Sequence, residues 1–285
     1  MRFRLIDAMK ARISVERGCQ VLKVSISGFY AWRRRKPSQR QRDDMVLLAH
    51  IRERFALSNG TYGGPRMTVD LREDGLACGK HRVARLMHDN GLKALQKRRY
   101  KKTTDSDHGG PVAPNLLDQD FTATAPDQKW GVDISYIWTA EGWLYLAIVL
   151  DLFSRRIVGW ATSDRLKKDL ALSALARAIA TRRPLPGLIH HSDRGSQYCS
   201  DDYRKLVGQA KMLASMSGKG NCYDNAMVET VFKTIKSELV WRTSFQTRQQ
   251  ATIELGLYID GFYNHRRRHS ALGYLSPIAF ENAMT

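Results

Sequence analysis

Three stretches rich in β-branched and aromatic residues follow one another in the middle of the chain, and they constrain its fold more than any other feature. They are WGVDISYIW (130–138), WLYLAIVLDLF (143–153) and RRIVGWAT (155–162). Short stretches of this composition are typical of strands, and connections of a few residues join antiparallel neighbours. We therefore expect three antiparallel strands at the start of a sheet.

The rest of this half alternates between helical and strand patterns. The patterns are helical at 167–183 and 201–210 and strand-like at 188–193 and 212–217, and a further helix is expected within 221–239. The resulting order, three strands followed by α-β-α-β-α, is typical of a mixed α/β sheet with helices against its faces. The sequence thus predicts an α/β fold with a mixed five-stranded sheet flanked by helices.

Residues 12–36 predict two short helices around a turn, with Ser25 or Ser27 as the N-cap of the second. This pattern resembles a helix-turn-helix, whose second helix enters the major groove of DNA. The second helix ends in three basic residues: Arg33, Arg34 and Arg35. An αα-hairpin whose arginines only complement the helix C-terminus explains the pattern equally well.

Further helical patterns follow at 45–57 and 80–90, with a third between them, and then a polar segment with the composition of a linker. We expect an all-α, helix-turn-helix-like region over residues 1–102, a linker over 103–120, and the α/β domain with a C-terminal helical segment over 121–285.

Basic charge is concentrated in the first part of the chain. The chain has 46 Lys and Arg against 28 Asp and Glu, and residues 1–105 hold 25 of the basic and 10 of the acidic residues. A basic arm on a nearly neutral body suits a polyanion binder, because neutralised phosphates release counterions. A solvated basic surface, or a protein that only coats RNA, would show the same balance.

Other classes of protein are disfavoured. The four cysteines form no CxxC pair, so neither a zinc site nor a disulfide framework is indicated. The N-terminus lacks the apolar core of a signal peptide, and the longest apolar run, residues 143–150, is too short to span a bilayer. We expect a cytoplasmic protein, associated with the nucleoid and not with a membrane.

Three acidic residues occupy notable positions. Asp133 lies in the middle of the first strand, Asp193 ends the fourth, and Glu229 lies near the start of the last helix of the domain. Carboxylates from two strands and a nearby helix can meet at one point, where they would repel one another without cations. Mg²⁺ prefers such oxygen ligands and suits a site shared with phosphate.

Glu229 shares one side of its expected helix with two lysines, Lys233 and Lys236. The lysines would lie at the rim of an acidic site, within reach of a DNA backbone. A solvated Glu–Lys pair, which contributes a few tenths of a kcal/mol, is the simpler explanation of the same spacing. We also expect Asp224 to cap this helix, and Trp130, Trp143 and Trp160 to belong to the core.

Four long motifs carry a family resemblance. They are WGVDISYIWTAEGWLYLAIVLDLFSRRIVGW, HHSDRGSQYCS, SMSGKGNCYDNAMVETVFKTIKSEL and YNHRRRHSALGYLSP. They closely resemble the second-frame (B) product of transposases in insertion-sequence family three. Asp133, Asp193 and Glu229 correspondingly look like the D, D and E triad of the retroviral integrase and transposase superfamily.

This resemblance implies an RNase H-like catalytic core that binds two Mg²⁺ or Mn²⁺ ions, cuts transposon-end DNA and joins it to target DNA. Asp133 would bridge the ions, and Asp193 and Glu229 would each complete one shell. It also implies a first-frame product, as fusion or partner, and a homo-oligomer on DNA. Expected DNA contacts are Lys233, Lys236, Arg33, Arg34, Arg35, Arg194, Lys219, Asn221, Arg266 and Arg268.

Two other functions stay open at this stage. A regulatory protein could bind transposon ends without cutting them, although the intact set of acids argues against it. A nuclease of the same fold would only hydrolyse DNA. Products joined through a 3′-hydroxyl would distinguish a transposase from such a nuclease.

Overall fold

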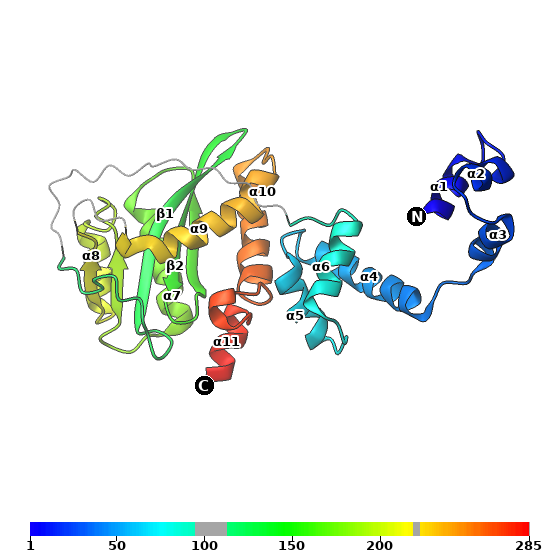
Figure 1. Ribbon diagram of the computed structural model, residues 1–285. Helices are drawn as coiled ribbons and strands as arrows, with labels where there is room; N and C mark the ends of the chain where they lie inside the picture. Colours follow the sequence, from blue (N-terminus) through cyan, green and yellow to red (C-terminus); the bar gives the residue numbers. More distant parts are fainter. Residues whose placement is uncertain (95–112, 219–222, 285) are drawn as a thin grey trace.

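A five-stranded mixed sheet forms the centre of the C-terminal part of the protein (Figure 1). The computed structural model describes residues 1–94, 113–218 and 223–284. The strand order is β3-β2-β1-β4-β5, with β1, β2 and β3 antiparallel and β4 and β5 parallel to β1. The strands are β1 (Lys129–Thr139), β2 (Gly142–Asp151), β3 (Ile157–Ser163), β4 (Ile189–Ser192) and β5 (Leu213–Met216). The predicted sheet is confirmed.

Each face of the sheet is covered by helices. These are α7 (Lys168–Arg182), α8 (Asp201–Gln209), α9 (Ala226–Glu238) and α10 (Arg248–Gly256). Helices α7 and α8 cover one face through a core that includes Trp130 and Leu175. Helices α9 and α10 cover the other through a core that includes Ile148 and Ile235. Because both faces are buried, β2 is apolar along nearly its whole length and does not alternate.

The chain continues from α10 without a break and packs into the core of the same face. It consists of a π-helical segment (Leu257–Tyr263), a 3-10 turn (Ser270–Leu272) and α11 (Pro277–Met284). Two further 3-10 turns, Tyr223–Asn225 and Val240–Arg242, flank α9. A buried ion pair joins these parts, since Arg267 donates to Glu238 at the end of α9 over 2.6 and 2.8 Å. The Tyr258 hydroxyl donates to the same carboxylate.

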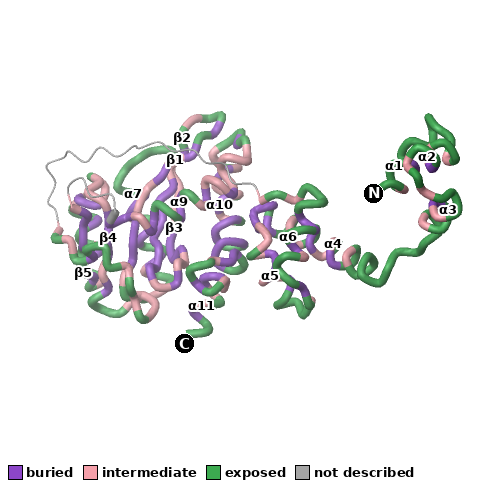
Figure 2. Tube along the Cα trace, in the orientation of Figure 1, coloured by how far each residue is buried: buried purple, intermediate pink, exposed green. Residues whose placement is uncertain are grey.

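The N-terminal helices divide into two groups. They are α1 (Arg2–Met9), α2 (Val15–Val21), α3 (Ile26–Arg34), α4 (Gln39–Leu57), α5 (Gly64–Glu73) and α6 (Lys80–Asp89). Helices α1–α3 form a small core of their own around Cys19 and Phe29, and lie away from the sheet (Figure 1). Figure 2 shows that most of this group is exposed, whereas the strands are buried.

Helices α4–α6 instead share the core of the α9 face. Ile51, Met67 and Val83 belong to the same buried cluster as Ile137 and Tyr263 of the α/β domain. None of the helices in the described ranges is long and apolar enough to cross a membrane.

Several local predictions can be compared with the structure. Ser25 caps α3, as expected. The prediction that Asp224 caps α9 is wrong: a 3-10 turn precedes the helix, and the buried Asp224 carboxylate accepts from Asn115 and from the Gly218 N–H. Trp130 is fully buried, but Trp143 is 44% exposed at the end of the β1–β2 hairpin, so its assignment to the core is wrong.

Candidate active site at the end of strand β4

The pairing of β1 with β4 brings two acidic residues to neighbouring positions. Lys129 pairs with Ile189 and Gly131 with His191, and the strands run parallel. Continued by two residues, this register places Asp193 beside Asp133. Strand β4 ends at Ser192, so β1 continues without a partner on that side and the two acids lie at the end of the paired region.

A glycine lets α9 approach β1 closely enough to bring in the third acid. A Cβ atom added at Gly131 would lie 2.7 Å from Val228 Cγ2 and 3.2 Å from a methyl of Leu152. The first separation is shorter than real contacts of a Cβ atom, so any side chain at this position would displace Val228, and glycine permits the close crossing. Glu229 directly follows the buried Val228 and is itself exposed at the side of the helix.

The charges of the three carboxylates act on one another. Burial raises the pKa of Asp133 well above its usual value, and the negative charges of Asp193 and Glu229 raise it further. The Ile134 N–H, which donates to Asp133 over 2.7 Å, and the nearby Lys236 ammonium oppose this rise in pKa. Partial burial also raises the pKa of Glu229. The site thus holds three acids in mutual repulsion.

The acids are neighbours but do not form a ready-made cage. Within the part of the chain that the structure describes, no three His, Cys, Asp or Glu side chains are gathered so as to hold a metal ion. One Asp193 oxygen accepts the Gly195 N–H over 2.9 Å, which turns that carboxylate toward its own loop. The side chains must therefore rearrange before all three carboxylates can face one ion.

Tyr198 is a member of this site that the sequence analysis did not identify. It is buried, and its hydroxyl has no hydrogen-bond partner among the described residues. Burial raises the pKa of Tyr198, and the charges of Asp133 and Asp193 raise it further. An unsatisfied buried hydroxyl beside two carboxylates, together with an all-oxygen donor set, fits a site for a hard divalent cation. Its position five residues after Asp193 was the available signal.

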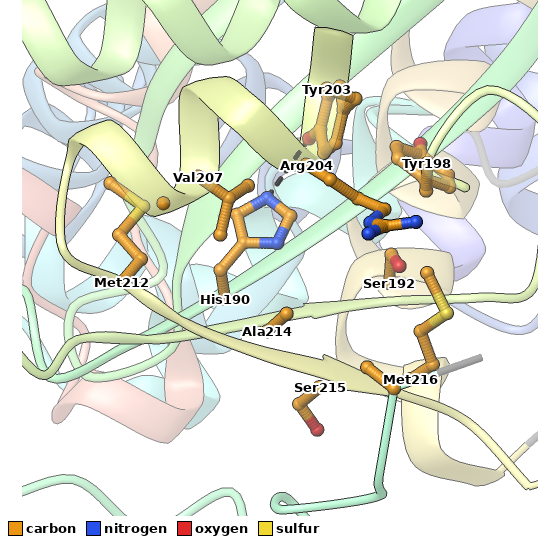
Figure 3. A pocket seen from close by; sticks show the side chains of 12 residues that line it. His190, Ser192, Tyr198, Tyr203, Arg204, Val207, Met212, Ala214, Ser215 and Met216 are labelled. Atoms are coloured by element: carbon orange, nitrogen blue, oxygen red, sulfur yellow. Dashed lines mark hydrogen bonds between the residues drawn. The ribbon is translucent and has the colours of Figure 1, made fainter. Parts of the chain in front are cut away.

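The two histidines before Asp193 have structural partners. His190 contacts the Tyr203 hydroxyl over 3.0 Å, in a cavity of about 360 Å³ between α8 and the β4–β5 edge (Figure 3). His191 contacts the hydroxyls of Ser215 and Ser217. Burial lowers the pKa of each histidine to about 4, so both are neutral at pH 7. These contacts leave the Ser–His–Asp arrangement of a hydrolase without support.

The basic residues expected near the acids occupy different environments. Lys233 is exposed on α9, and the Lys236 ammonium lies 5.1 Å from the centre of the Tyr136 ring. Burial lowers the pKa of Lys236, and the charge of Asp133 partly restores it. Arg194 donates from Nε to the Ser217 carbonyl over 2.8 Å, which ties the Asp193 loop to the end of β5. Lys219 and Asn221 lie outside the described residues.

The two C-terminal arginines expected to contact DNA differ in their exposure to solvent. Arg266 is exposed, but Arg268 is buried and donates to Asp70 over 2.8 Å and to Glu73 over 2.6 Å. The structure thus gives Arg268 an internal role that joins α5 to the C-terminal segment, and removes it from the surface that DNA can reach. At the other end of the chain, the arginines that end α3 are all exposed: Arg33, Arg34 and Arg35.

Comparison with protein families agrees with this arrangement. Two profiles, each described as an integrase core domain, match residues 123–222 and 210–277, and an HTH-like domain matches residues 41–100. The last match falls on α4–α6, within residues 1–102, for which the sequence analysis predicts a helix-turn-helix-like region. The α/β part is therefore an integrase-type, RNase H-like core.

Among solved structures, the chain resembles two retroviral assemblies. One is the simian T-cell lymphotropic virus intasome in complex with the PP2A regulatory subunit B56 gamma, with a TM-score of 0.47 and 14% identity over 77% of this chain and 70% of that one. The other is the HTLV-2 integrase catalytic core domain in complex with magnesium, with a TM-score of 0.44 and 13% identity over 56% of this chain and 99% of that one.

Similarity in sequence is much closer to proteins of bacterial insertion elements. An uncharacterized 31 kDa protein of insertion element IS600 from Shigella sonnei is 46% identical, over 92% of this chain and 96% of that one. Transposase InsF for insertion sequence IS3A from Escherichia coli strain K12 is 42% identical, over 99% of both chains. The chain belongs to the IS3 family of insertion-sequence transposases, enzymes of DNA transposition.

Proposed function

We propose that Asp133, Asp193 and Glu229 are the catalytic carboxylates of this transposase and hold two Mg²⁺ or Mn²⁺ ions. The observation that carries the proposal is the register of β1 and β4, which sets Asp193 beside Asp133 at the end of the paired strands. The close crossing of α9 at Gly131 brings Glu229 to the same place. The raised pKa of Asp133, caused by burial and then by the charges of Asp193 and Glu229, supports a site that needs compensating positive charge.

Bound divalent ions would activate a water or a DNA 3′-hydroxyl and stabilise the leaving 3′-oxygen, for in-line cleavage and strand transfer. The side chains of the protein position the DNA backbone and the carboxylates. Lys233 and Lys236 lie on the same side of α9 as Glu229 and hold the phosphate backbone over the acids. The Tyr198 hydroxyl donates to an oxygen of the Asp133 or Asp193 carboxylate and fixes its rotamer once the site is assembled.

DNA binding is distributed over both groups of N-terminal helices in this proposal. The basic end of α3 contacts DNA through Arg33, Arg34 and Arg35, and the helices α4–α6 form the HTH-like unit next to the catalytic core. Residues 103–120 then link this region to the catalytic domain of residues 121–285. Replacing the three arginines by alanine should weaken DNA binding and lower the slope of affinity against salt concentration; an unchanged slope would assign them to a solvated surface.

Transposition also needs partners. We propose that the chain acts on transposon-end and target DNA as a homo-oligomer, and together with a first-frame product as fusion or partner. The protein then acts in the cytoplasm, on the DNA of the nucleoid. Arg266, which is exposed in the C-terminal segment, contributes to binding of the second DNA.

The test is cleavage and joining of labelled terminal DNA in Mg²⁺ or Mn²⁺, with and without the first-frame product. The variants are Asp193→Asn and Glu229→Gln, and Asp202→Asn on the exposed start of α8 is the matched control. We expect the two site variants to lose cleavage and joining by several orders of magnitude while binding DNA normally, and the control to remain active. Activity retained in either site variant would refute the carboxylate assignment. Nicks without joined products would indicate a nuclease. Binding without cleavage in every sample would indicate a regulatory protein.

A further inference from the structure

A pair of tryptophans projects from the end of the β1–β2 hairpin into solvent. Trp138 and Trp143 face each other across the two strands as directly paired residues. Their side chains are packed edge to face, with ring centres 4.9 Å apart, yet the residues are 59% and 44% exposed. Trp130 on the same strand is fully buried, so exposure is a property of this position and not of the residue type.

The exposed pair is connected by side-chain contacts to Lys236 of α9, the helix that also carries Glu229. The Tyr136 ring packs edge to face on Trp143, at 5.1 Å between centres. The Lys236 ammonium lies 5.1 Å from the Tyr136 ring centre, and its charge acts on Asp133. This row of Tyr136, Trp138 and Trp143, which we call the aromatic ladder, runs from Lys236 to the hairpin end along the part of β1 that β4 leaves unpaired.

The hairpin end that carries the ladder is held in place. Arg248, at the start of α10, donates from Nε to the Trp143 carbonyl over 3.0 Å, and its N–H donates to Glu141 over 2.8 Å. The Ala140 N–H donates to the Phe245 carbonyl over 3.0 Å. The tip is therefore fixed on the domain, and the two rings are presented in a defined orientation. Preorganised rings lose little entropy when a flat partner stacks on them.

We propose that the aromatic ladder stacks on unpaired nucleotides of the DNA end that enters the catalytic site, and so selects frayed over fully paired ends. This inference rests on the proposed function. Flat aromatic faces combined with flanking positive charge are what single-stranded nucleic acid binds, because every base has a face to stack and a phosphate to neutralise. The ladder supplies the aromatic faces, and Lys236 supplies positive charge at its inner end.

The experiment compares two DNA ends of one sequence, fully paired or with the last three base pairs unpaired, bound by the full-length chain in EDTA. A 2-aminopurine in the unpaired strand reports stacking through loss of its fluorescence. The variants are Trp138→Ala/Trp143→Ala and Trp138→Phe/Trp143→Phe. The control is Ile253→Ala, an apolar residue of α10 that is 55% exposed.

We expect the wild type and the control to bind the frayed end more tightly and to quench 2-aminopurine. The alanine variant should bind the frayed end about tenfold or more weakly than the wild type does. Its affinity for the paired end should be unchanged. The phenylalanine variant, which keeps flat rings, should retain most of the preference, and this separates stacking from a loss of folding. A wild-type chain without preference or quenching, or an alanine variant that retains both, would overturn the proposal.

Two further outcomes distinguish stacking from self-association and from catalysis. If the alanine variant keeps the frayed-end preference but changes the sedimenting mass without DNA, the pair joins copies of the chain and the stacking proposal is wrong. Because binding is measured without metal, it is independent of catalysis. An Asp193→Asn chain that cuts nothing yet prefers frayed ends supports the ladder, and a cutting wild type without that preference defeats the ladder alone.

Discussion

Asp193 follows β4 in a register that sets it beside Asp133 of β1, although sixty residues of chain separate the two. Parallel strands need a crossover, and here the crossover contains two strands and α7. The main chain thus holds the two residues near each other, and the negative charge of Asp193 acts on the Asp133 carboxylate. The free energy of the folded state should therefore depend on whatever neutralises them.

Removing one of the paired acids should stabilise the protein when no divalent metal is present. Asp133→Asn relieves the repulsion from Asp193 and Glu229, and we expect a gain of roughly 1 kcal/mol, or about 2–4 °C in melting temperature. The same variant should lose the rise in melting temperature that Mn²⁺ causes in the wild type. Differential scanning calorimetry in EDTA and in Mn²⁺ measures both effects. An undiminished Mn²⁺ effect would show that the ion binds elsewhere.

The crossing of α9 over β1 should not accept a methyl group. Gly131→Ala puts a carbon 2.7 Å from Val228 Cγ2, so α9 must shift, and we expect a loss of about 1–3 kcal/mol in the free energy of unfolding. Denaturant titration measures the loss. Gly208→Ala in α8 is the matched control, since a Cβ there meets nothing within 4 Å and should be neutral or stabilising. Equal effects of the two substitutions would contradict the close packing.

Neighbouring C-terminal arginines should give opposite results. Arg268→Ala leaves the Asp70 and Glu73 carboxylates without their partner, and should cost roughly 2–3 kcal/mol of stability. Arg266→Ala should leave stability unchanged and reduce DNA affinity, with a salt slope smaller by about one. Thermal unfolding and DNA binding at several salt concentrations separate the two. Loss of DNA affinity without loss of stability in Arg268→Ala would contradict its internal role.

Acid should destabilise the sheet through His190. Burial, and then the neighbouring His191, lowers its pKa from 6.5 to about 4, so the folded state favours the neutral ring. The stabilisation is complete above pH 6.5 and is lost as the pH falls toward 4, by roughly 3 kcal/mol in total. His190→Gln should flatten the dependence of unfolding free energy on pH in this window. His88→Gln, whose side chain is 84% exposed, should leave it unchanged.

The sheet was predictable because its signals are local. Composition and short turns indicated each strand, and the order of elements followed. The start of α4 was placed too late, although Ser38 and Gln41 form a capping box that the sequence displays. Helix α1 was missed, because its apolar residues are few and only Ile6 is buried.

The site was predictable in its acids and less so in its surroundings. Asp133 and Asp193 stand at strand positions that the pattern reveals. By contrast, nothing local distinguishes Arg266 from Arg268, because the partners of Arg268 lie about two hundred residues earlier in the chain. The same holds for Trp130 and Trp143, whose burial depends on where β4 ends and which helices cover the sheet.

Helices α4–α6 and the α9 face of the sheet share one buried cluster, so they should unfold together. The two parts are distant in the sequence, but Ile51 and Met67 pack in the same buried cluster as Tyr263. Heat should therefore melt the HTH-like helices and the helix that carries Glu229 in a single cooperative step. Helices α1–α3, with a core of their own, are free to melt in a separate transition.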